Sequence, residues 1–447
     1  MYWQNKRILV LGYGITGKSM ISYLRRKRAI VYIYDDKLGF SYPDSSIWEN
    51  KDAVFQLTEA DIDMLAVSPG FAPTHPVVSH FVNKSIPTIG DIEIAYIDRG
   101  KNDWIAITGT NGKTTTTMLI DHLLRKLGEN SQTFGNIGVP VLDAVEFEGI
   151  PVVEVSSFQL EYAPTFKPHI GVFLNLTPDH LNRHGDMQGY FLAKMRMFLN
   201  QNSDDFAIFN ADDEWANKGK TMVSSSVVMF SPSGKDADIV AREQKIYVRD
   251  NLLWDLTGNT RFLYPPYLED LLGALGALIA LGYEDKLREI TSDVLDDFVF
   301  ARHRMEEVAT IGGVIFINDS KATNVASTIA AIKGFEGSKL LLILGGSRKD
   351  TSYDKLAEEI KRLGVKYVAL IGDTSPDIKN SLDKVGYKNY EHVATLEDAV
   401  RLLWSKSQPG DIILLSPACA SFDMFNNYKH RGDTFVEIVN RLAKEYD

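Results

Sequence analysis

Cysteine is almost absent from the sequence. Its 447 residues include a single one, Cys419, which excludes an internal disulfide. Long apolar runs are missing as well, since no stretch comes near the roughly 18 residues that a membrane-spanning helix needs. The first apolar run, residues 8–11, is too short for the core of a secretory leader and ends in glycine. We therefore expect a cytoplasmic protein that does not enter a membrane.

An excess of positive charge is also lacking. The formal net charge is -11 at pH 7, which argues against bulk binding to nucleic acid or to an anionic membrane. A local basic site for one small polyanion is still compatible with this charge. Low-complexity tracts, short repeats and sustained heptads are absent too. With 45% hydrophobic and 24% charged residues the composition is globular, and the length predicts about three domains.

A glycine-rich stretch at residues 109–115 lies between the apolar run 104–107 and a helical pattern at 118–124. A strand, a glycine loop and a helix together bind phosphate, because backbone N–H groups and the helix dipole face one anion. Lys113 adds a full charge, and the Thr114 hydroxyl is suited to hold Mg²⁺. The strict P-loop pattern has glycine where this chain has Ile107. The stretch nevertheless predicts a nucleoside triphosphate site.

The first ninety residues alternate strand and helix patterns, with strands expected at 7–11, 30–34 and 64–67. The first strand is followed by Gly12-x-Gly14-x-x-Gly17, and the second ends at Asp35. This spacing is typical of a turn that approaches a pyrophosphate, with the acid on a ribose hydroxyl. NAD and a UDP-sugar both present these groups, so both interpretations stay open. A third turn with Pro69 and Gly70 is expected at the same sheet edge.

The rest of the chain repeats this alternation. We expect strands near 152–155, 170–174 and 206–209, helices near 114–127 and 187–200, and a small antiparallel extension over 224–264. The pair Pro265-Pro266 predicts a break before a helix at 268–281. Fully apolar runs at 314–317, 340–344, 367–371 and 412–415 predict strands buried on both faces. The sequence therefore indicates parallel α/β units throughout.

Polar residues follow the expected central strands. Glu154 sits among apolar residues, where a carboxylate is paired or metal-bound. The loop 175–184 carries Asp179, His180 and His184, which suit a Mg²⁺ site or acid–base work as well as ordinary hydrogen bonding. Lys194 lies one helix later, where composition alone favours a solvated helix-face lysine. Asn136 offers an amide near the same edge or is a plain turn residue.

Three polar loops are expected at one end of the last sheet, after the strands that end near 317, 344 and 415. They span residues 318–324, 345–350 and 416–423, and 301–304 adds a further basic segment. Ligands of parallel sheets collect at this end, so the loops together predict a binding site.

Seven motifs across nearly the whole chain resemble those of the Mur ligases of peptidoglycan synthesis. They are residues 109–115, Glu154 with 156–160, 179–181, Lys194, 303–304, 318–324 and 416–421. The resemblance implies a three-domain α/β fold. Residues 1–93 would form a Rossmann-like UDP-sugar-binding domain, 94–298 a central P-loop ATPase-like domain, and 299–447 a Rossmann-like domain for the amino acid. The central domain would combine a parallel sheet with the small antiparallel extension.

The resemblance also implies the activity of an ATP-dependent amide ligase that works through an acyl phosphate. The chain has no Asp-Asn-Pro-Arg, with which the diaminopimelate-adding members hold their amino acid. This favours the branch that adds D-glutamate to UDP-N-acetylmuramoyl-L-alanine. The implied cofactors are ATP, Mg²⁺ at two sites and a carbamylated lysine. The implied partners are the two small substrates, with no nucleic acid and no membrane, and the protein is expected to be a monomer.

The resemblance assigns roles residue by residue. The catalytic residues would be Lys113, His180 and Lys194. The metal ligands would be Thr114, Glu154, His180 and Lys194 as its carbamate. ATP would meet Gly109, Thr110, Asn111, Gly112, Lys113, Thr114, Thr115, Arg304, Asp319 and Lys321. The UDP-sugar would meet Gly14, Ile15, Thr16, Asp35, Pro69, Gly70, Asn136 and Gln159. D-Glutamate would meet Lys321, Thr323, Lys349, Ser421, Phe422 and Tyr428.

Two positions depart from the family pattern. Relatives carry His-Asn-x-x-Asn before the last central helix, whereas this chain has Pro266-Tyr267-Leu268-Glu269-Asp270, so the adenine contacts are not assigned. Relatives also tend to have an acid where Ser347-Arg348 stand, which leaves Lys349 less supported than Lys321.

Three other functions compete with the ligase. A nicotinamide oxidoreductase would use Gly12, Gly14, Gly17 and Asp35, but it leaves the P-loop unexplained. A folate polyglutamylating ligase would share the second and third domains but not the first. A non-catalytic nucleotide-binding regulator would not need Lys113, Glu154, His180 and Lys194 together.

Overall fold

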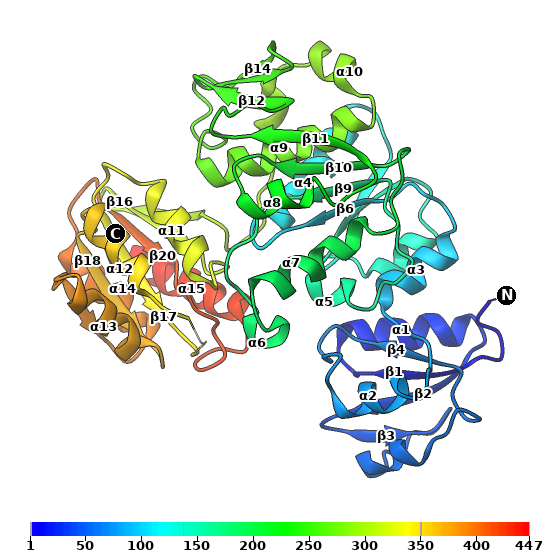
Figure 1. The fold of residues 1–447 in the computed structure, drawn as a ribbon. Helices are drawn as coiled ribbons and strands as arrows, with labels where there is room; N and C mark the ends of the chain where they lie inside the picture. The colour runs from blue at the N-terminus through cyan, green and yellow to red at the C-terminus, as the bar shows by residue number, and fades with distance from the viewer. Residues whose placement is uncertain (1, 137, 349–350, 447) are drawn as a thin grey trace. The chain divides into compact units, whose positions relative to one another are not determined.

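The computed structural model describes residues 2–136, 138–348 and 351–446. By its internal contacts the chain divides into two compact units (Figure 1). The first unit comprises Met1–Leu263 and Tyr267–Phe298, and the second comprises Tyr264–Pro266 and Val299–Asp447. The first unit contains two sheets and the second contains one. The boundaries expected at 93/94 and 298/299 stay predictions.

The first sheet is five-stranded, in the order β3-β2-β1-β4-β5. Its elements are β1 (Arg7–Leu11), α1 (Ile15–Arg26), β2 (Ile30–Asp35), β3 (Gly39–Ser41), the 3-10 helix η1 (Lys51–Gln56), β4 (Met64–Val67), α2 (Pro76–Val82), β5 (Thr88–Ile89) and α3 (Asp91–Arg99). All its strands are parallel except β3. The apolar run of β1 is buried on both faces, as expected for the central strand of a parallel sheet.

The second sheet is nine-stranded, in the order β14-β13-β12-β11-β10-β9-β6-β8-β7. Its strands are β6 (Ile105–Thr108), β7 (Ser131–Gly135), β8 (Ile150–Glu154), β9 (Ile170–Phe173), β10 (Phe206–Asn210), β11 (Ser226–Ser231), β12 (Ile239–Arg242), β13 (Lys245–Val248) and β14 (Asn251–Asp255). The pairs β12–β13 and β13–β14 are antiparallel, and the other neighbouring pairs of this sheet are parallel. The predicted antiparallel extension is therefore limited to β12, β13 and β14 within 224–264, because β11 pairs in parallel with both β10 and β12.

Helices accompany this second sheet in chain order. They are α4 (Lys113–Lys126), η2 (Val141–Val145), α5 (Ser157–Leu160), α6 (Leu181–His184), α7 (Met187–Met195), η3 (Arg196–Phe198), α8 (Glu214–Gly219), α9 (Pro265–Ala280), α10 (Glu284–Glu289) and η4 (Ser292–Leu295). Helix α9 begins at Pro265 instead of after the proline pair. Proline is well placed in a first helical turn, where its fixed φ fits and no N–H is needed.

The third sheet is six-stranded, in the order β15-β16-β20-β17-β18-β19. Its elements are β15 (Glu306–Ile311), β16 (Val314–Asn318), α11 (Val325–Lys333), β17 (Leu340–Gly345), α12 (Asp354–Arg362), β18 (Tyr367–Ile371), α13 (Ser375–Lys384), β19 (Tyr390–His392), α14 (Leu396–Lys406), β20 (Ile412–Leu415) and α15 (Tyr428–Tyr446). Strands β16, β20 and β17 are parallel neighbours. The loops that follow them therefore leave the same sheet edge, as predicted.

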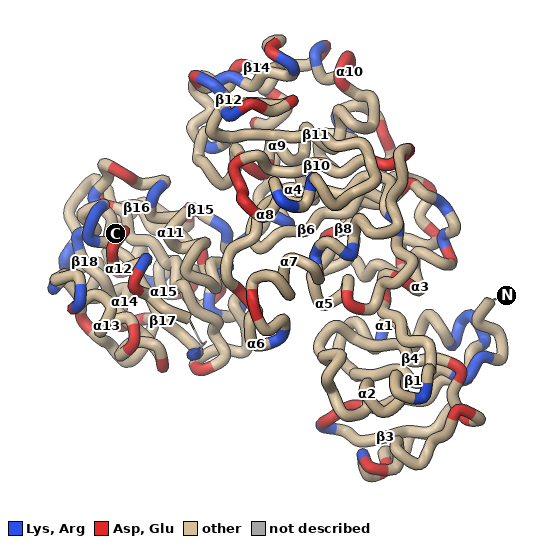
Figure 2. The backbone as a smooth tube through the Cα atoms, in the orientation of Figure 1, with Lys and Arg blue, Asp and Glu red and all other residues tan. Residues whose placement is uncertain are grey.

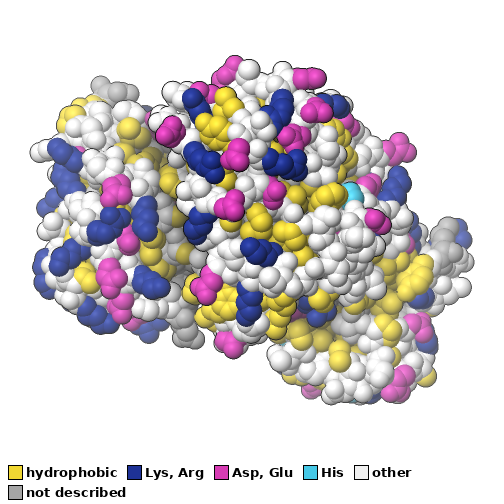
Figure 3. Space-filling view, turned by 45° about the horizontal axis from the view of Figure 1, so that its top comes forward, with side chains coloured by type: hydrophobic (Ala, Val, Ile, Leu, Met, Phe, Trp, Pro, Cys, Tyr) yellow, Lys and Arg dark blue, Asp and Glu magenta, His cyan; other side chains and the backbone are white. Residues whose placement is uncertain are grey.

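Acidic and basic residues are interspersed along the chain in both units (Figure 2). The face drawn in Figure 3 shows the same mixture of acidic and basic side chains. Within the described residues, every helix is too short or too polar to span a bilayer.

Candidate active site

The glycine loop connects β6 to α4. Gly112 caps the amino end of α4 at φ +83°, and a Cβ atom there would lie 2.0 Å from the Asp270 carboxylate. Only glycine therefore fits between the loop and α9 without a rearrangement. Lys113 Nζ donates hydrogen bonds of 2.8 Å to the carbonyls of Gly109 and Thr110. The ammonium thus lies over the loop, beside the positive end of the helix dipole.

Thr114 and Glu154 are in direct contact. Thr114 Oγ1 donates to Glu154 Oε2 at 2.7 Å, and Asn136 Nδ2 donates to Glu154 Oε1 at 3.0 Å. Glu154 is 2% exposed at the end of β8, next to β6 in the sheet. A hydroxyl and a carboxylate are the hard oxygen ligands that Mg²⁺ prefers, so these residues fit the ion. Among the described residues no group of three or more His, Cys, Asp or Glu side chains could hold a metal. Phosphate and hydroxyl oxygens would have to complete such a site.

Lys194 is not the solvated lysine that composition favours. Its side chain is 1% exposed, and Nζ donates to the Gly109 carbonyl at 2.7 Å. Nζ also lies 4.7 Å from the centre of the Tyr190 ring. Burial, helped by the charge of Lys113, holds the pKa of Lys194 well below its usual range. The unprotonated amine is the form that reacts with carbon dioxide to give a carbamate.

His180 caps α6 with a left-handed backbone, at φ +55°. Its ring lies 4.8 Å from that of Phe158 and 6.3 Å from that of Tyr190. Lys194 and His180, the two predicted ligands of the second metal, therefore share Tyr190 as a neighbour.

His184 has a different environment. It stacks on Tyr190, with ring centres 5.1 Å apart, and makes a hydrogen bond of 3.0 Å to Ser157 Oγ. Burial lowers its pKa to about 4, so His184 is a neutral packing residue at pH 7.

The first sheet presents the predicted UDP-sugar residues at one edge. Gly14, Ile15 and Thr16 lie at the start of α1, while Pro69 and Gly70 follow the neighbouring strand β4. Gly17 packs so tightly that an added Cβ would lie 1.8 Å from the Gly12 carbonyl oxygen, which agrees with the helix-packing role of a third glycine.

Asp35 joins two turns at this edge. Its carboxylate accepts backbone hydrogen bonds from Tyr13, Lys37 and Leu38 at 2.9, 3.0 and 3.3 Å. Burial alone would raise the pKa of Asp35, but these three donors outweigh it and lower the pKa. Asp35 is therefore charged and fixed at the mouth of the glycine turn.

Gln159 is held by two neighbours. Its Oε1 accepts from the N–H and the hydroxyl of Ser156 at 3.1 and 3.0 Å, which closes a capping box on α5. Its Nε2 donates to Asp91 Oδ2 at 3.2 Å, and burial raises the pKa of Asp91 to about 6. Asp91 was not predicted from the sequence. The available signal was an acidic residue directly after Gly90, at the start of a helix.

Of the predicted nucleotide residues of the second unit, Asp319 and Lys321 lie on the loop after β16, and Arg304 precedes β15. Asp319 Oδ2 accepts from Ser416 Oγ at 2.8 Å, which joins the ends of β16 and β20. Burial raises the pKa of Asp319 to about 7, with the nearby charge of Arg304 opposing it. Lys321 Nζ lies 4.1 Å from the centre of the Tyr428 ring. These residues form one cluster at the predicted edge.

The remaining residues predicted to contact D-glutamate differ in their exposure to solvent. Ser421 is buried while Phe422 is 74% exposed. Thr323 follows Lys321 in the same turn. Lys349 lies outside the described residues. Arg431, which sequence reasoning missed, donates to Ser320 Oγ and to the Cys419 carbonyl at 3.0 Å each and so ties two of the loops together.

The start of α9, where the family pattern is missing, packs against the P-loop. Asp270 Oδ1 accepts a hydrogen bond of 3.3 Å from Thr116. Glu269 accepts from Asn175, and burial raises its pKa to about 7. Asp270 stands at the position of the last asparagine of the pattern that this chain lacks.

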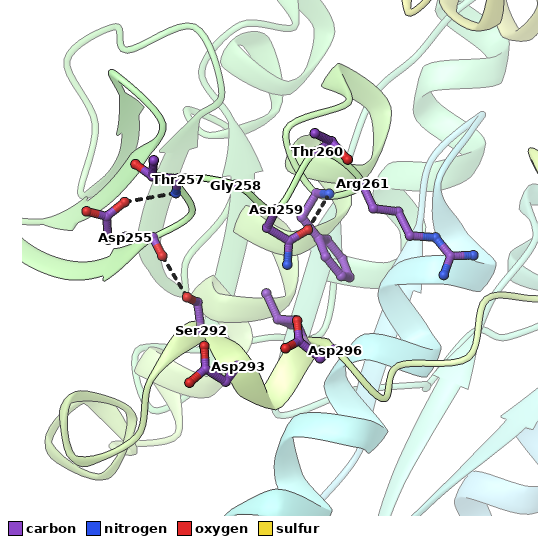
Figure 4. Close-up of a pocket in the computed structure, with 11 residues that line it drawn as sticks. Asp255, Thr257, Gly258, Asn259, Thr260, Arg261, Ser292, Asp293 and Asp296 are labelled. Carbon is purple, nitrogen blue, oxygen red and sulfur yellow. Dashed lines mark hydrogen bonds between the residues drawn. The ribbon is translucent and has the colours of Figure 1, made fainter.

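A separate cavity of about 460 Å³ lies between η4 and the loop from β14 to α9 (Figure 4). Its lining includes Asp255, Arg261 and Asp296, and none of its lining residues is a predicted site residue.

Three family descriptions match the chain in order. Residues 6–90 match the Mur ligase MurD-like N-terminal domain, 107–256 the Mur ligase middle domain, and 303–419 the Mur ligase glutamate ligase domain. Proteins of Caldicellulosiruptor bescii and Pelotomaculum thermopropionicum are each 37% identical to the chain, and one of Clostridioides difficile is 36% identical. Each alignment covers 98% of this chain and at least 98% of the relative. The chain belongs to the Mur ligase family.

All three relatives bear the name UDP-N-acetylmuramoylalanine--D-glutamate ligase. Solved Mur ligases share the fold of this Mur ligase. The MurF ligase of Thermotoga maritima in complex with ADP has a TM-score of 0.62 at 15% identity, over 99% of this chain and 96% of that one. The MurC ligase of the same organism has a TM-score of 0.59 at 18% identity, over 98% and 99%. The full-length matches decide against the nicotinamide interpretation of Gly12, Gly14 and Gly17.

Proposed function

We propose that this Mur ligase forms an amide between the alanyl carboxylate of UDP-N-acetylmuramoyl-L-alanine and the amine of D-glutamate, with ATP converted to ADP and phosphate. The observation that carries the proposal is the phosphate-binding loop with Lys113 above it and the Thr114–Glu154 pair beside it. The names of the full-length relatives support the two substrates. Both substrates and ATP are cytoplasmic metabolites, which supports the expected compartment.

The reaction needs two steps because a carboxylate is a poor electrophile. First, an oxygen of the alanyl carboxylate attacks the γ-phosphorus of ATP, ADP leaves, and an acyl phosphate forms. The amine of D-glutamate then attacks the acyl carbon, the C–O bond to phosphate breaks, and the amine loses a proton. The products are the amide, ADP and inorganic phosphate.

Lys113 and the first turn of α4 lower the repulsion between the attacking carboxylate and the triphosphate. Thr114 and Glu154 would hold a Mg²⁺ ion, which supplies positive charge to the phosphate oxygens when bound. Lys194 as a carbamate would hold a second ion together with His180. The burial of Lys194 and its lowered pKa support this modification, since a carbamate offers the carboxylate-like oxygens that a cation prefers.

The other two sheets would supply binding. The edge of the first sheet, with Gly14, Asp35 and Pro69, would hold the UDP group, and Gln159 and Asn136 would face the muramoyl-alanine end. In the second unit Arg304 and Asp319 would meet the nucleotide, and Lys321 and Tyr428 would meet D-glutamate. The monomeric state and Lys349 as a D-glutamate ligand stay predictions.

A substrate panel tests the proposal. Purified protein is given Mg²⁺, ATP and UDP-N-acetylmuramoyl-L-alanine with D-glutamate, L-glutamate, D-aspartate, L-lysine or diaminopimelate, and ADP release is followed. We expect release with D-glutamate at least ~100-fold faster than with any other amine, because a site built for paired polar groups rejects ligands that leave them unpaired. Release that does not depend on D-glutamate would contradict the proposal.

A further inference from the structure

Arg183 links the loop after β4 of the first sheet to helix α6 beside the second sheet. The sequence alone did not indicate that these two parts are in contact. Arg183 Nη1 donates to the Pro69 carbonyl at 2.7 Å, and its Nη2 donates to the Phe71 carbonyl at 2.9 Å. Both carbonyls belong to the loop that follows β4 in the first sheet, whereas Arg183 lies on α6 beside the second sheet. One guanidinium group therefore holds the backbone of this loop at two points.

The guanidinium group is itself fixed. Its Nε lies 3.0 Å from Glu161 Oε2, and the two side chains are only 9% and 13% exposed. Its Cζ lies 4.1 Å from the centre of the Phe158 ring. A planar cation that is paired, stacked and largely buried has little freedom, so its position is set by the second sheet's own elements.

Tyr162 adds a second link to the same loop. Its hydroxyl donates to the Phe71 carbonyl at 2.8 Å, and its own carbonyl accepts from Gly90 N–H at 2.7 Å. The loop is therefore fixed to the second sheet through three hydrogen bonds from two side chains.

On its other side the loop touches the glycine turn. The Phe71 ring lies so close to Gly12 that a Cβ atom there would be 3.2 Å from it. The same ring lies 4.8 Å from the ring of His75, whose Nε2 is 3.2 Å from Asp36. The loop thus has a separate anchor within the first sheet.

The link also reaches the phosphate side. Phe158, on which Arg183 stacks, lies 4.8 Å from the His180 ring, and the Arg183 N–H donates to the His180 carbonyl at 3.0 Å. A continuous set of contacts therefore runs from Gly12 through Phe71, Arg183 and Phe158 to His180.

We propose that Arg183 is a positioning residue that fixes the distance between the UDP edge and the phosphoryl-transfer site, and so selects acceptors whose nucleotide and carboxylate are that far apart. The proposal rests on the proposed function. An acceptor that bridges both edges binds strongly only if the edges are held at the matching separation, because each half is then bound without rearrangement. A ligand that occupies one edge alone does not depend on that separation.

The test compares Arg183→Met with a matched control, Arg196→Met. Arg196 also donates to a backbone carbonyl, that of Leu160 at the end of α5, at 2.8 Å. Three quantities are measured for both variants. They are kcat and KM for UDP-N-acetylmuramoyl-L-alanine, the inhibition constant of UDP alone, and the KM for ATP. We expect Arg183→Met to lower kcat/KM for the bridging acceptor about 30-fold, mainly through KM, with the UDP and ATP constants changed less than about twofold. Arg196→Met should change none of them.

Hydrogen exchange gives a readout that does not need activity. Peptides covering residues 69–75 should exchange faster in Arg183→Met than in Arg196→Met. Tyr162→Phe should speed the exchange of the same loop, but less strongly. The loss of kcat/KM in the double variant should be smaller than the product of the two single losses, since both side chains bond the Phe71 carbonyl. Unchanged exchange of the loop, or equal loss of UDP and acceptor binding, would overturn the proposal. One outcome would disprove the proposed function alone. In it, the wild-type protein does not use the acceptor, while Arg183→Met still makes the loop exchange faster.

Discussion

Replacing Lys113 with methionine is expected to lower the rate of ADP formation about a thousandfold. The Lys113 ammonium lies over the glycine loop through two hydrogen bonds of 2.8 Å, where the triphosphate would gather its negative charge. Its interaction strengthens as charge moves toward the leaving oxygen, so the loss should appear in kcat as well as in KM. The measurement is the initial rate at saturating acceptor and D-glutamate.

The matched control for Lys113→Met is Lys126→Met, at the other end of α4. Lys126 Nζ pairs with Asp297 at 2.5 Å on the protein surface. This variant removes the same charge from the same helix, and its rate should stay within about twofold of wild type because exposed pairs contribute little. A Lys113→Met enzyme that keeps a tenth of its activity would contradict the assignment of the loop.

Lys194→Ala is expected to remove nearly all activity, by about two to three orders of magnitude, and high bicarbonate should not restore it. The side chain is buried beside the Gly109 carbonyl, and its lowered pKa makes the reactive amine form more accessible than in a solvated lysine. Wild-type protein equilibrated with ¹³C-bicarbonate should therefore show a carbamate carbon signal that the variant lacks. Lowering the pH should weaken the signal, because protonation removes the nucleophilic amine.

The control for Lys194→Ala is Lys218→Ala. Lys218 is exposed and lies over the rings of Phe191 and Trp215 on the same side of the sheet. Unchanged turnover in Lys194→Ala, or an identical carbamate signal in both variants, would remove the carbamate from the mechanism.

Strands with unbroken apolar runs were predictable from the sequence, as β1, β16 and β17 show. A strand that is buried on both faces of a parallel sheet consists of a nearly continuous run of apolar residues. Strands β5 and β19 were missed because they have only two and three residues and carry no such pattern. Strand β15 was missed because its exposed edge position allows charged residues such as Glu306.

The site was predictable where a local motif fixes the geometry. Thr114 follows β6 and Glu154 ends the adjacent parallel strand β8, so the two side chains meet at one sheet edge. The family resemblance had already implied this pair. The burial of Lys194 was not predictable, since a lysine one helix away has no local signal for its surroundings. Arg183 was missed for the same reason, because its partners at Pro69 and Phe71 are more than a hundred residues away in sequence.

The central claim is that the acceptor's carboxylate takes a phosphoryl group from ATP. The most direct test uses UDP-N-acetylmuramoyl-L-alanine labelled with ¹⁸O in its alanyl carboxylate, with ATP, Mg²⁺ and D-glutamate. Each amide formed should release one phosphate carrying one ¹⁸O atom, because the acyl C–O bond is the one that breaks. Amide formation that leaves the released phosphate unlabelled would contradict it.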